Sequence, residues 1–561
     1  MTLPKYDEIV QGHNGDCFLV ASIAALLAVN FDFTQIVSSK EKGKYEVKIF
    51  SEGGERGEVV IIDGLIPCGV GVGAIFAHSR NGDMSCFGVI EKAFAKFEGL
   101  CEFWRLKGGN VSECLYSLTG LGCEDLHDVK NWKPIILTNW NSKNPMGTGH
   151  IDTHEKGDNL RTNYNIRKNH AYAIVDADNN IVKIYNPHGN DDGFKGKKGG
   201  DGAGTLSFSW EEFNKVMNRL QVCPFNNISE GVMNYKNWTK EFTHDTAGGC
   251  SNFSSFRFND VLIMKSEEIT SYVTFMMGTN DVRKIIEHGD SIKYPEIGIT
   301  IIKLNDKKGV KEDFYGLTPE KYTVIKKTRC FANKRETVLT LESKEVEKNG
   351  GYLGIIFSTY EPINNLPYWT AIRSKNEIEC MWRSTLVPKI TTLYYKGKLG
   401  TTEKSTTYLE VKGVGRSVKF FVFLKGVGVV KPLGVWLLKM EEGGEYKVLE
   451  KPEFIKATEI TWKGVIEGGG EGVVICPALH GSVKGDVETE IEVKVLGEGF
   501  EMRRLNDEKC KIYPGKFGEK KVLVKGGKGG NKIVKKKTVK PVGFAGAKKG
   551  LDNISDLYGS L

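Results

Sequence analysis

Residues 11–31 read QGHNGDCFLVASIAALLAVNF, and this stretch decides the fold of the N-terminal region. From Cys17 to Phe31 the residues are apolar around the whole circumference of a helix, which is typical of a helix buried at the centre of a domain. The run is too short to cross the hydrocarbon core of a membrane, which takes about 20 residues. We therefore predict a central, buried helix that begins at Cys17.

The residues before this helix indicate chemistry as well as structure. The Cys17 sulfur would lie at the helix N-terminus, where the partial positive charge of the helix favours a thiolate. Gly12 and Gly15 permit the tight backbone that leads into the helix. The side-chain amide of Gln11 and the backbone N–H of Cys17 could together form an oxyanion hole. A lone cysteine at a helix start is usually only a small buried side chain, so a catalytic interpretation needs further residues.

A predicted hairpin supplies such residues. HAYAIVDAD (170–178) and IVKIYNP (181–187) are strand-like segments joined by a short turn. His170 begins the first strand and Asn186 ends the second, so pairing of the strands places them across from each other. A cysteine nucleophile needs a base, and an asparagine can accept the ring N–H of a histidine and fix its tautomer.

The remaining pattern predicts a mixed N-terminal region and an all-β region after it. A helix is expected from Ser209, a suitable N-cap with Glu212 at the capping-box position. From about residue 246 apolar, β-rich segments alternate with glycine-rich turns, and the similar segments 353–362 and 472–481 indicate two copies of one unit. Further helices are expected at 17–30, 86–98 and 111–118, a hairpin at 45–64 and a strand at 134–140.

Several segments, in chain order, resemble the calpain family of cysteine proteases. They are Q-G-x-x-G-D-C at 11–17, VIEKAFAKFEG at 89–99, H-A-Y at 170–172, N-P-x-G at 186–189, DGAGTLSFSWEEFNKVMNRLQVC at 201–223 and DTAGGCSNF at 245–253. The resemblance implies an α+β fold, with a papain-like protease core made of a helical half and a β-rich half, followed by two β-sandwich domains. The boundaries we expect are 1–242 for the core, 243–385 and 386–510 for the sandwiches, and 511–561 for a flexible tail.

The resemblance also implies roles for individual residues. By this match Cys17 is the nucleophile, His170 the general base and then acid, Asn186 its orienting partner and Gln11 the oxyanion donor. The implied function is an endopeptidase that makes limited cuts in intracellular proteins. The alternative is a catalytically weak or inactive relative that acts as a scaffold and docks at membranes or cytoskeleton through its β-sandwiches and tail.

The resemblance further implies regulatory calcium. Family cores bind two calcium ions, and the matching carboxylates here are Glu8 and Glu102 for one site and Asp192 and Asp201 for the other, with no EF-hand loop near the C-terminus. In the family a movable tryptophan follows the N-P pair, whereas this sequence has His188. We therefore expect the enzyme to be gated differently from its relatives, or less tightly.

The charge of the chain is concentrated at one end. The 561 residues carry a formal net charge of +8, but residues 511–561 hold 13 Lys and 3 acidic residues, so the tail is +10 and the remainder −2. A near-neutral body argues against a nucleic-acid-binding domain, whereas the tail could meet an anionic membrane. The twelve cysteines are scattered without a C-x-x-C pair, and MTLPKYDEIV carries no signal segment, so we expect a cytoplasmic protein with reduced thiols.

Overall fold

The computed structural model describes residues 5–505 apart from short gaps. The gaps longer than three residues are 81–85, 152–162, 225–233, 305–321, 347–350, 386–389, 400–407, 441–445, 451–454, 468–471 and 480–486. The predicted tail, 511–561, lies outside the described residues. The chain divides into two compact units, one reaching to Trp382 and the other beginning at Arg383.

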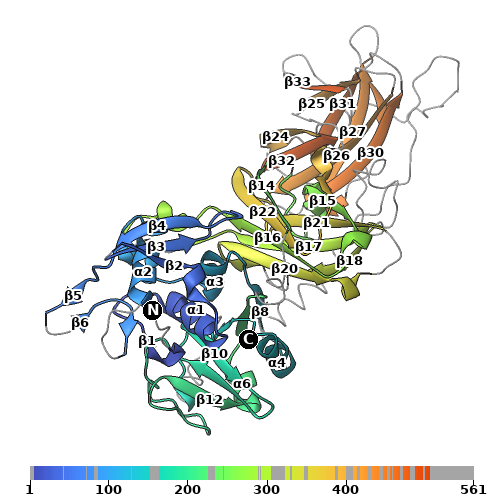
Figure 1. The fold of residues 1–561 in the computed structure, drawn as a ribbon. Helices are drawn as coiled ribbons and strands as arrows, with labels where there is room; N and C mark the ends of the chain where they lie inside the picture. Colours follow the sequence, from blue (N-terminus) through green and yellow to red (C-terminus); the bar gives the residue numbers. More distant parts are fainter. Residues whose placement is uncertain are drawn as a thin grey trace. The chain divides into compact units, whose positions relative to one another are not determined.

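Helix α1 (Cys17–Ala28) is the centre of the first unit, as predicted. Its residues from Phe18 to Leu26 are all buried. Figure 1 shows α1 beside α3 (Val111–Thr119) and β10 (Ala171–Ala177), and it packs against both, and against α2 (Cys86–Phe97). Since all-round burial suits an all-round apolar sequence, the core of the helical half forms around this helix.

The helical half also carries small sheets at its periphery. The predicted hairpin is confirmed as β3 and β4, in which Val47 pairs with Val60 and both side chains are buried. The sheets are β2 (Val37–Glu41), β3 (Lys44–Ile49) and β4 (Glu58–Asp63); β1 (Ile9–Val10) with β7 (His78–Ser79); and β5 (Cys68–Gly69) with β6 (Gly73–Ala74).

The second half of the core contains a six-stranded antiparallel sheet. It also contains a helix, α6 (Trp210–Val216), whose start at Ser209 was predicted from the sequence. Ser209 caps α6 in a capping box with Glu212. The predicted hairpin is present as β10 and β11, with Ala173 opposite Tyr185. The strand order is β12 (Thr205–Ser209), β11 (Ile181–Tyr185), β10, β9 (Met146–Gly149), β13 (Arg219–Val222) and β8 (Glu124–His127).

The prediction of a strand at 134–140 is wrong, because this segment is helix α4 (Lys133–Asn141). Pro134 lies in the first turn of the helix, where its missing N–H costs no hydrogen bond. Ile136 is fully buried in the apolar cluster below the sheet, and Trp140, four residues later, packs against the same cluster. The helical spacing of these two side chains therefore outweighs the β propensity of the isoleucines.

The residues after 234 form two pairs of sheets with the same strand order. In the first pair the sheets are β14 (Asn234–Phe242), β22 (Leu366–Ser374), β16 (Tyr272–Thr279) and β20 (Glu336–Glu342), and β18 (Tyr322–Lys327), β17 (Glu296–Leu304), β21 (Tyr352–Thr359), β15 (Val261–Lys265) and β23 (Cys380–Trp382), with β19 (Ala332–Asn333) beside β17. One hydrophobic cluster takes side chains from both of these sheets.

The second pair repeats this order ten strands later along the chain. Its sheets are β24 (Ile390–Leu399), β32 (Val487–Leu496), β26 (Ser417–Val427) and β30 (Glu459–Glu467), and β28 (Tyr446–Glu450), β27 (Lys431–Met440), β31 (Gly472–Leu479), β25 (Tyr408–Gly413) and β33 (Phe500–Leu505), with β29 (Ile455–Ala457) beside β27. The two similar sequence segments contain β21 and β31, which occupy equivalent places in the two orders.

The first sheet pair belongs to the same compact unit as the core, although the sequence predicted a domain boundary near 242. Arg335, just before β20, is 5% exposed and binds Glu98 (2.6 Å) and Ser117 (2.8 Å) of the helical half. The preceding residue, Lys334, lies 3.7 Å from Asp125 in the β-rich half. Two adjacent residues of the sheet pair therefore contact both halves of the core.

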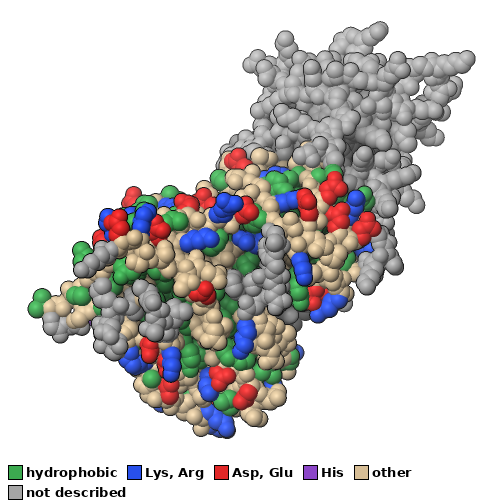
Figure 2. All heavy atoms as spheres, in the orientation of Figure 1, with side chains coloured by type: hydrophobic (Ala, Val, Ile, Leu, Met, Phe, Trp, Pro, Cys, Tyr) green, Lys and Arg blue, Asp and Glu red, His purple; other side chains and the backbone are tan. Residues whose placement is uncertain are grey.

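The surface of the described residues is mixed in charge. Figure 2 shows Lys and Arg interspersed with Asp and Glu over the face in view. Among the described residues no helix is both long enough and apolar enough to cross a bilayer.

Replacing Arg335 should destabilise the first unit. Arg335→Met is expected to lower the free energy of unfolding by about 3–5 kcal/mol, because it leaves the buried Glu98 carboxylate without its cation. Urea denaturation followed by tryptophan fluorescence measures this change. The matched control is Lys344→Ala, which removes an ion pair to Glu342 whose lysine is 78% exposed and should leave the midpoint unchanged. Equal midpoints for wild type and Arg335→Met would contradict the expected role.

Candidate functional site

Cys17 occupies the first position of α1, where the sequence placed it, but its environment does not favour a thiolate. The thiol is partly exposed, and it hydrogen-bonds with the backbone of Ala171 at the start of β10. Burial nevertheless raises the pKa of the Cys17 thiol, and the nearby charge of Asp16 adds to this effect. The expectation of a thiolate stabilised by the helix N-terminus is therefore corrected, because desolvation outweighs the backbone N–H groups.

His170 and Asn186 meet at the end of the hairpin that the sequence predicted. His170 Nε2 lies 2.9 Å from Asn186 Oδ1, and the two side chains are buried. Burial lowers the pKa of His170 to about 4, and the hydrogen bond to Asn186 offsets this only in part. The imidazole is therefore neutral at physiological pH.

The hydrogen bonds of Asn186 fix which ring nitrogen of His170 carries the proton. Asn186 Nδ2 donates to the backbone oxygen of Asn190 (2.8 Å) and to Asp192 Oδ2 (2.9 Å). Because its two N–H groups are engaged there, Asn186 presents Oδ1, an acceptor, to His170. Nε2 of His170 must then be the donor, and Nδ1 keeps a free lone pair that can accept a proton.

Gln11 is tied to the loop that follows Asn186. Its backbone N–H donates to Pro187 O (2.8 Å), and its side-chain Nε2 donates to Asn14 O (2.6 Å). Next to it, the hydroxyl of Tyr185 donates to the carbonyl of Ile9. The segment that leads to Cys17 is thus joined to the segment that carries Asn186 by hydrogen bonds between the two halves of the core.

His188 covers the pair formed by His170 and Asn186. Its ring centroid is 4.5 Å from that of His170, with 33° between the ring planes. His188 Nδ1 lies 2.9 Å from Asp192 Oδ2 and its backbone N–H donates to Asn186 Oδ1 (3.2 Å). The residue at which the sequence departs from the family pattern is therefore in direct contact with the site.

A buried pair of carboxyl groups lies just before Cys17. Asp16 and Glu91 are both 0% exposed, and the backbone N–H of Ala77 donates to Glu91 (2.6 Å). Burial raises the pKa of both groups, that of Glu91 to about 10; Asp16 raises the pKa of Glu91 further, whereas the hydrogen bond with Glu91 partly offsets the rise for Asp16. At least one of the two therefore holds a proton at neutral pH, which limits the negative charge beside the thiol. No local pattern in the sequence indicates this pair, because its two members are 75 positions apart.

The four carboxylates predicted as calcium ligands already have protein partners. Glu8 accepts from Lys5 N (3.1 Å) and Glu102 from Arg105 Nε (2.7 Å). Asp201 accepts from the backbone N–H groups of Ala203 and Thr205, and Asp192 accepts from Nδ1 of His188. Among the described residues the structure forms no group of three or more His, Cys, Asp or Glu side chains that could hold a metal.

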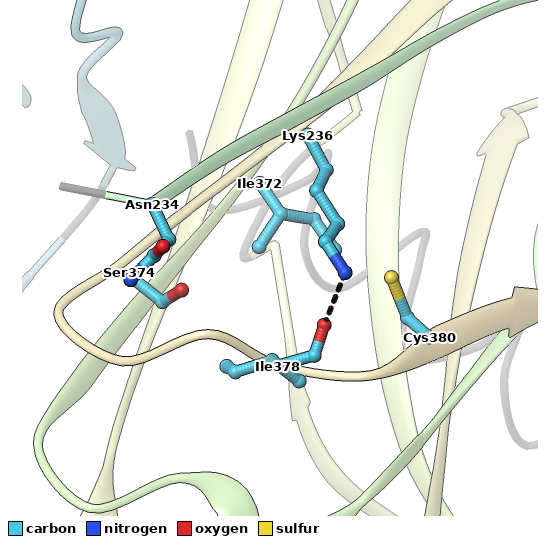
Figure 3. A pocket seen from close by; sticks show the side chains of 6 residues that line it. All are labelled: Asn234, Lys236, Ile372, Ser374, Ile378 and Cys380. Carbon is cyan, nitrogen blue, oxygen red and sulfur yellow. Dashed lines mark hydrogen bonds between the residues drawn. The ribbon is translucent and has the colours of Figure 1, made fainter.

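A small pocket lies at one edge of the first sheet pair and is separate from this site. Figure 3 shows Lys236 reaching toward Ile378, to whose carbonyl it donates (2.7 Å), beside Cys380. The lining residues are Asn234, Lys236, Ile372, Ser374, Ile378 and Cys380. None of them is a predicted site residue, so this pocket does not contribute to the candidate site.

Known proteins with similar sequences are calpains. The chain is 26% identical over 306 residues to the calpain-1 catalytic subunit of Rattus norvegicus, covering 47% of this chain and 42% of that protein. It is 28% identical to the calpain-2 catalytic subunit of Rattus norvegicus, covering 46% and 43%. It is 25% identical to the calpain-type cysteine protease DEK1 of Arabidopsis thaliana, covering 45% and 13%. The matches thus span less than half the length of these relatives.

The match to the family coincides with the part of the chain that contains the candidate site. Residues 4–246 match the model of the calpain family cysteine proteases. This range includes Cys17, His170, Asn186 and Gln11, and it ends near the start of the first sheet pair. The part of the chain that is similar to calpains is therefore the two-part core described above.

Proposed function

We propose that this protein is a calpain-like cysteine endopeptidase, which cuts protein substrates and uses Cys17 as its nucleophile. The observation that supports this most strongly is the buried pair of His170 and Asn186, joined at 2.9 Å beside the strand whose backbone contacts the Cys17 thiol. A nucleophile, a base and a group that orients the base are the parts that covalent hydrolysis requires. Similarity to calpains over the same residues supports the same reaction class.

In the proposed mechanism the resting thiol and imidazole are both neutral. His170 Nδ1 takes the thiol proton as the sulfur attacks the peptide carbonyl carbon, and Asn186 Oδ1 stabilises the imidazolium that forms. The oxyanion is held by the Cys17 backbone N–H and by an N–H of the Gln11 amide, of which one donates to Asn14. His170 then protonates the leaving amine. A water molecule, from which His170 takes a proton, attacks the thioester carbon; the C–S bond breaks, the carboxylic acid leaves, and the sulfur takes the proton back from His170.

The repeated strand order supports a proposal about the two sheet pairs. We infer that the two sheet pairs are the two β-sandwich domains predicted at 243–385 and 386–510, and that the first of them, which contacts the core through Arg335, regulates it. A cytoplasmic location, and attachment of the basic tail 511–561 to anionic membrane, stay predictions from the sequence.

Calcium is proposed only as a regulator. Glu8 and Glu102 carry hard oxygen donors, and each accepts a hydrogen bond from one protein group, Lys5 N or Arg105 Nε, so they suit a calcium ion whose other ligands come from elsewhere. Asp192 and Asp201 fit less well, because N–H donors surround them. No chemical step is assigned to the ion.

Cys17→Ser should abolish proteolysis. We expect casein cleavage to fall by more than about a thousandfold, since the nucleophile is lost, and labelling by a thiol-reactive peptidyl epoxide to disappear. Both are measured across a calcium titration, with Cys68→Ser, an exposed free cysteine, as the matched control that keeps activity. Absence of cleavage and labelling in the wild type, with and without calcium, would reject the enzyme and favour a scaffold that binds through its sheet pairs.

His188→Trp should change gating. An indole is larger than the ring that packs 4.5 Å from His170, so we expect roughly tenfold slower cleavage without calcium, from lost positioning of the base, and a greater stimulation by added calcium. Casein cleavage in chelator and at rising calcium concentrations measures both quantities. Unchanged activity and unchanged calcium response would refute the view that His188 sets a different gate.

A further inference from the structure

The carboxylate of Asp192 accepts hydrogen bonds from several side chains of the candidate site and its surroundings. Asp192 Oδ2 accepts from Asn186 Nδ2 (2.9 Å) and from His188 Nδ1 (2.9 Å). Arg167 clamps the same carboxylate with two bonds, from Nε to Oδ2 (2.8 Å) and from Nη2 to Oδ1 (3.1 Å). Asp192 therefore binds two side chains, those of Asn186 and His188, that are themselves in contact with His170.

The loop holds Asp192 in place from its backbone as well. The N–H of Asp192 donates to Asn190 Oδ1 (2.8 Å), and its carbonyl accepts from the side chain of Asn165. The side chains of Arg167, His188 and Asn186 all direct N–H groups at this carboxylate, so its oxygens act as acceptors to each of them.

An acceptor at this position constrains each neighbour. Asn186 must turn its N–H group toward Asp192, which leaves Oδ1 for His170. His188 must present a protonated Nδ1, which fixes its ring plane against His170. The first constraint favours the tautomer of His170 with a free Nδ1, the atom that would face a thiol proton, and the second restricts the pose of the His170 ring.

We propose that Asp192, clamped by Arg167, is a positioning residue of the peptidase site that sets the Asn186 amide and the His188 ring and thereby the tautomer and pose of His170. The role rests on the proposed function for its effect on cleavage, although the arrangement of His170 is measurable without a substrate. It also assigns Asp192 differently from the calcium site expected from the sequence, because three side-chain donors occupy its oxygens.

The test compares three variants of the full chain. Asp192→Ala removes the acceptor, and Arg167→Met keeps Asp192 but removes the two bonds that hold it. Because the side chain of Arg167 is 51% exposed, its replacement should leave the fold intact, so the second variant tests the role of Asp192 even if the first variant misfolds. The matched control is Asp191→Ala, a neighbouring carboxylate that accepts only from the backbone N–H groups of Gly202 and Gly204. Peptide cleavage gives kcat and KM, and ¹⁵N spectra of selectively labelled histidine, assigned with a His170→Gln variant, give the tautomer.

The expected results separate positioning from loop integrity. Asp192→Ala should lower kcat by about tenfold to a hundredfold with KM unchanged, and His170 should populate both tautomers instead of one. Arg167→Met should change both readouts in the same direction by less, and Asp191→Ala should change neither appreciably. Equal losses of kcat in the Asp191 and Asp192 variants, or an unchanged tautomer in Asp192→Ala, would overturn the proposal.

Two further outcomes keep the proposal distinct from the proposed function and from a metal site. If the wild type cleaves nothing, the peptidase function fails, and the tautomer comparison still decides the role of Asp192. If calcium shifts the His170 signals of the wild type but not those of Asp192→Ala, then Asp192 is a calcium ligand and the positioning role is overturned.

Discussion

The buried guanidinium of Arg335 is the contact on which the arrangement of the first unit depends. It binds Glu98, Ser117 and the backbone of Glu113 in the helical half, while Glu336 and Asp281 of the sheet pair neutralise its other side. Taking such charges out of water is costly, and the cost is offset when the buried donors find partners, as each of the three guanidinium nitrogens of Arg335 does. The sheet pair therefore has one well-satisfied position against the helical half.

The same edge reaches the other half of the core. Lys334 approaches Asp125 on β8, and Asp125 is also held by Arg219 through two bonds of 3.0 and 2.6 Å. Arg335 binds the half that carries Cys17, and Lys334 contacts the half that carries His170. A shift of the sheet pair would therefore change the position of one half relative to the other, and with it the geometry of the candidate site. This connection gives the regulatory role proposed for the sheet pair a physical route.

Burial sets the chemistry at the meeting point of the two halves. It raises the pKa of Cys17 and lowers that of His170, so both effects favour the neutral pair over a thiolate and an imidazolium. In the absence of charge, hydrogen bonds orient the His170 ring: Asn186 Oδ1 binds its Nε2, and the backbone N–H of His188 binds the same Asn186 oxygen. A site of this kind depends on geometry, which explains why its supporting carboxylate, Asp192, is bound from so many sides.

Much of this was predictable from local sequence pattern, and the rest depends on contacts between distant residues. The apolar run after Cys17 and the Ser209 cap define their helices locally, and a short hairpin suffices to bring His170 to Asn186. The segment from Pro134 was misassigned because its buried face depends on the sheet beneath it. Arg335 and Glu98 are 237 positions apart, and the role of Asp192 arises from the path of a loop, so neither leaves a periodic signal in the sequence.

The central claim is that the protein's own contacts bring the two halves of the core together around Cys17 and His170. A crystal structure of the full chain grown in chelator tests it most directly. The account predicts that Gln11 N remains bonded to Pro187 O and that the Cys17 sulfur lies within roughly 4 Å of His170 Nδ1, as a nucleophile and its base require. Halves rotated apart, with the Gln11–Pro187 bond broken and Arg335 still bound to Glu98, would contradict it.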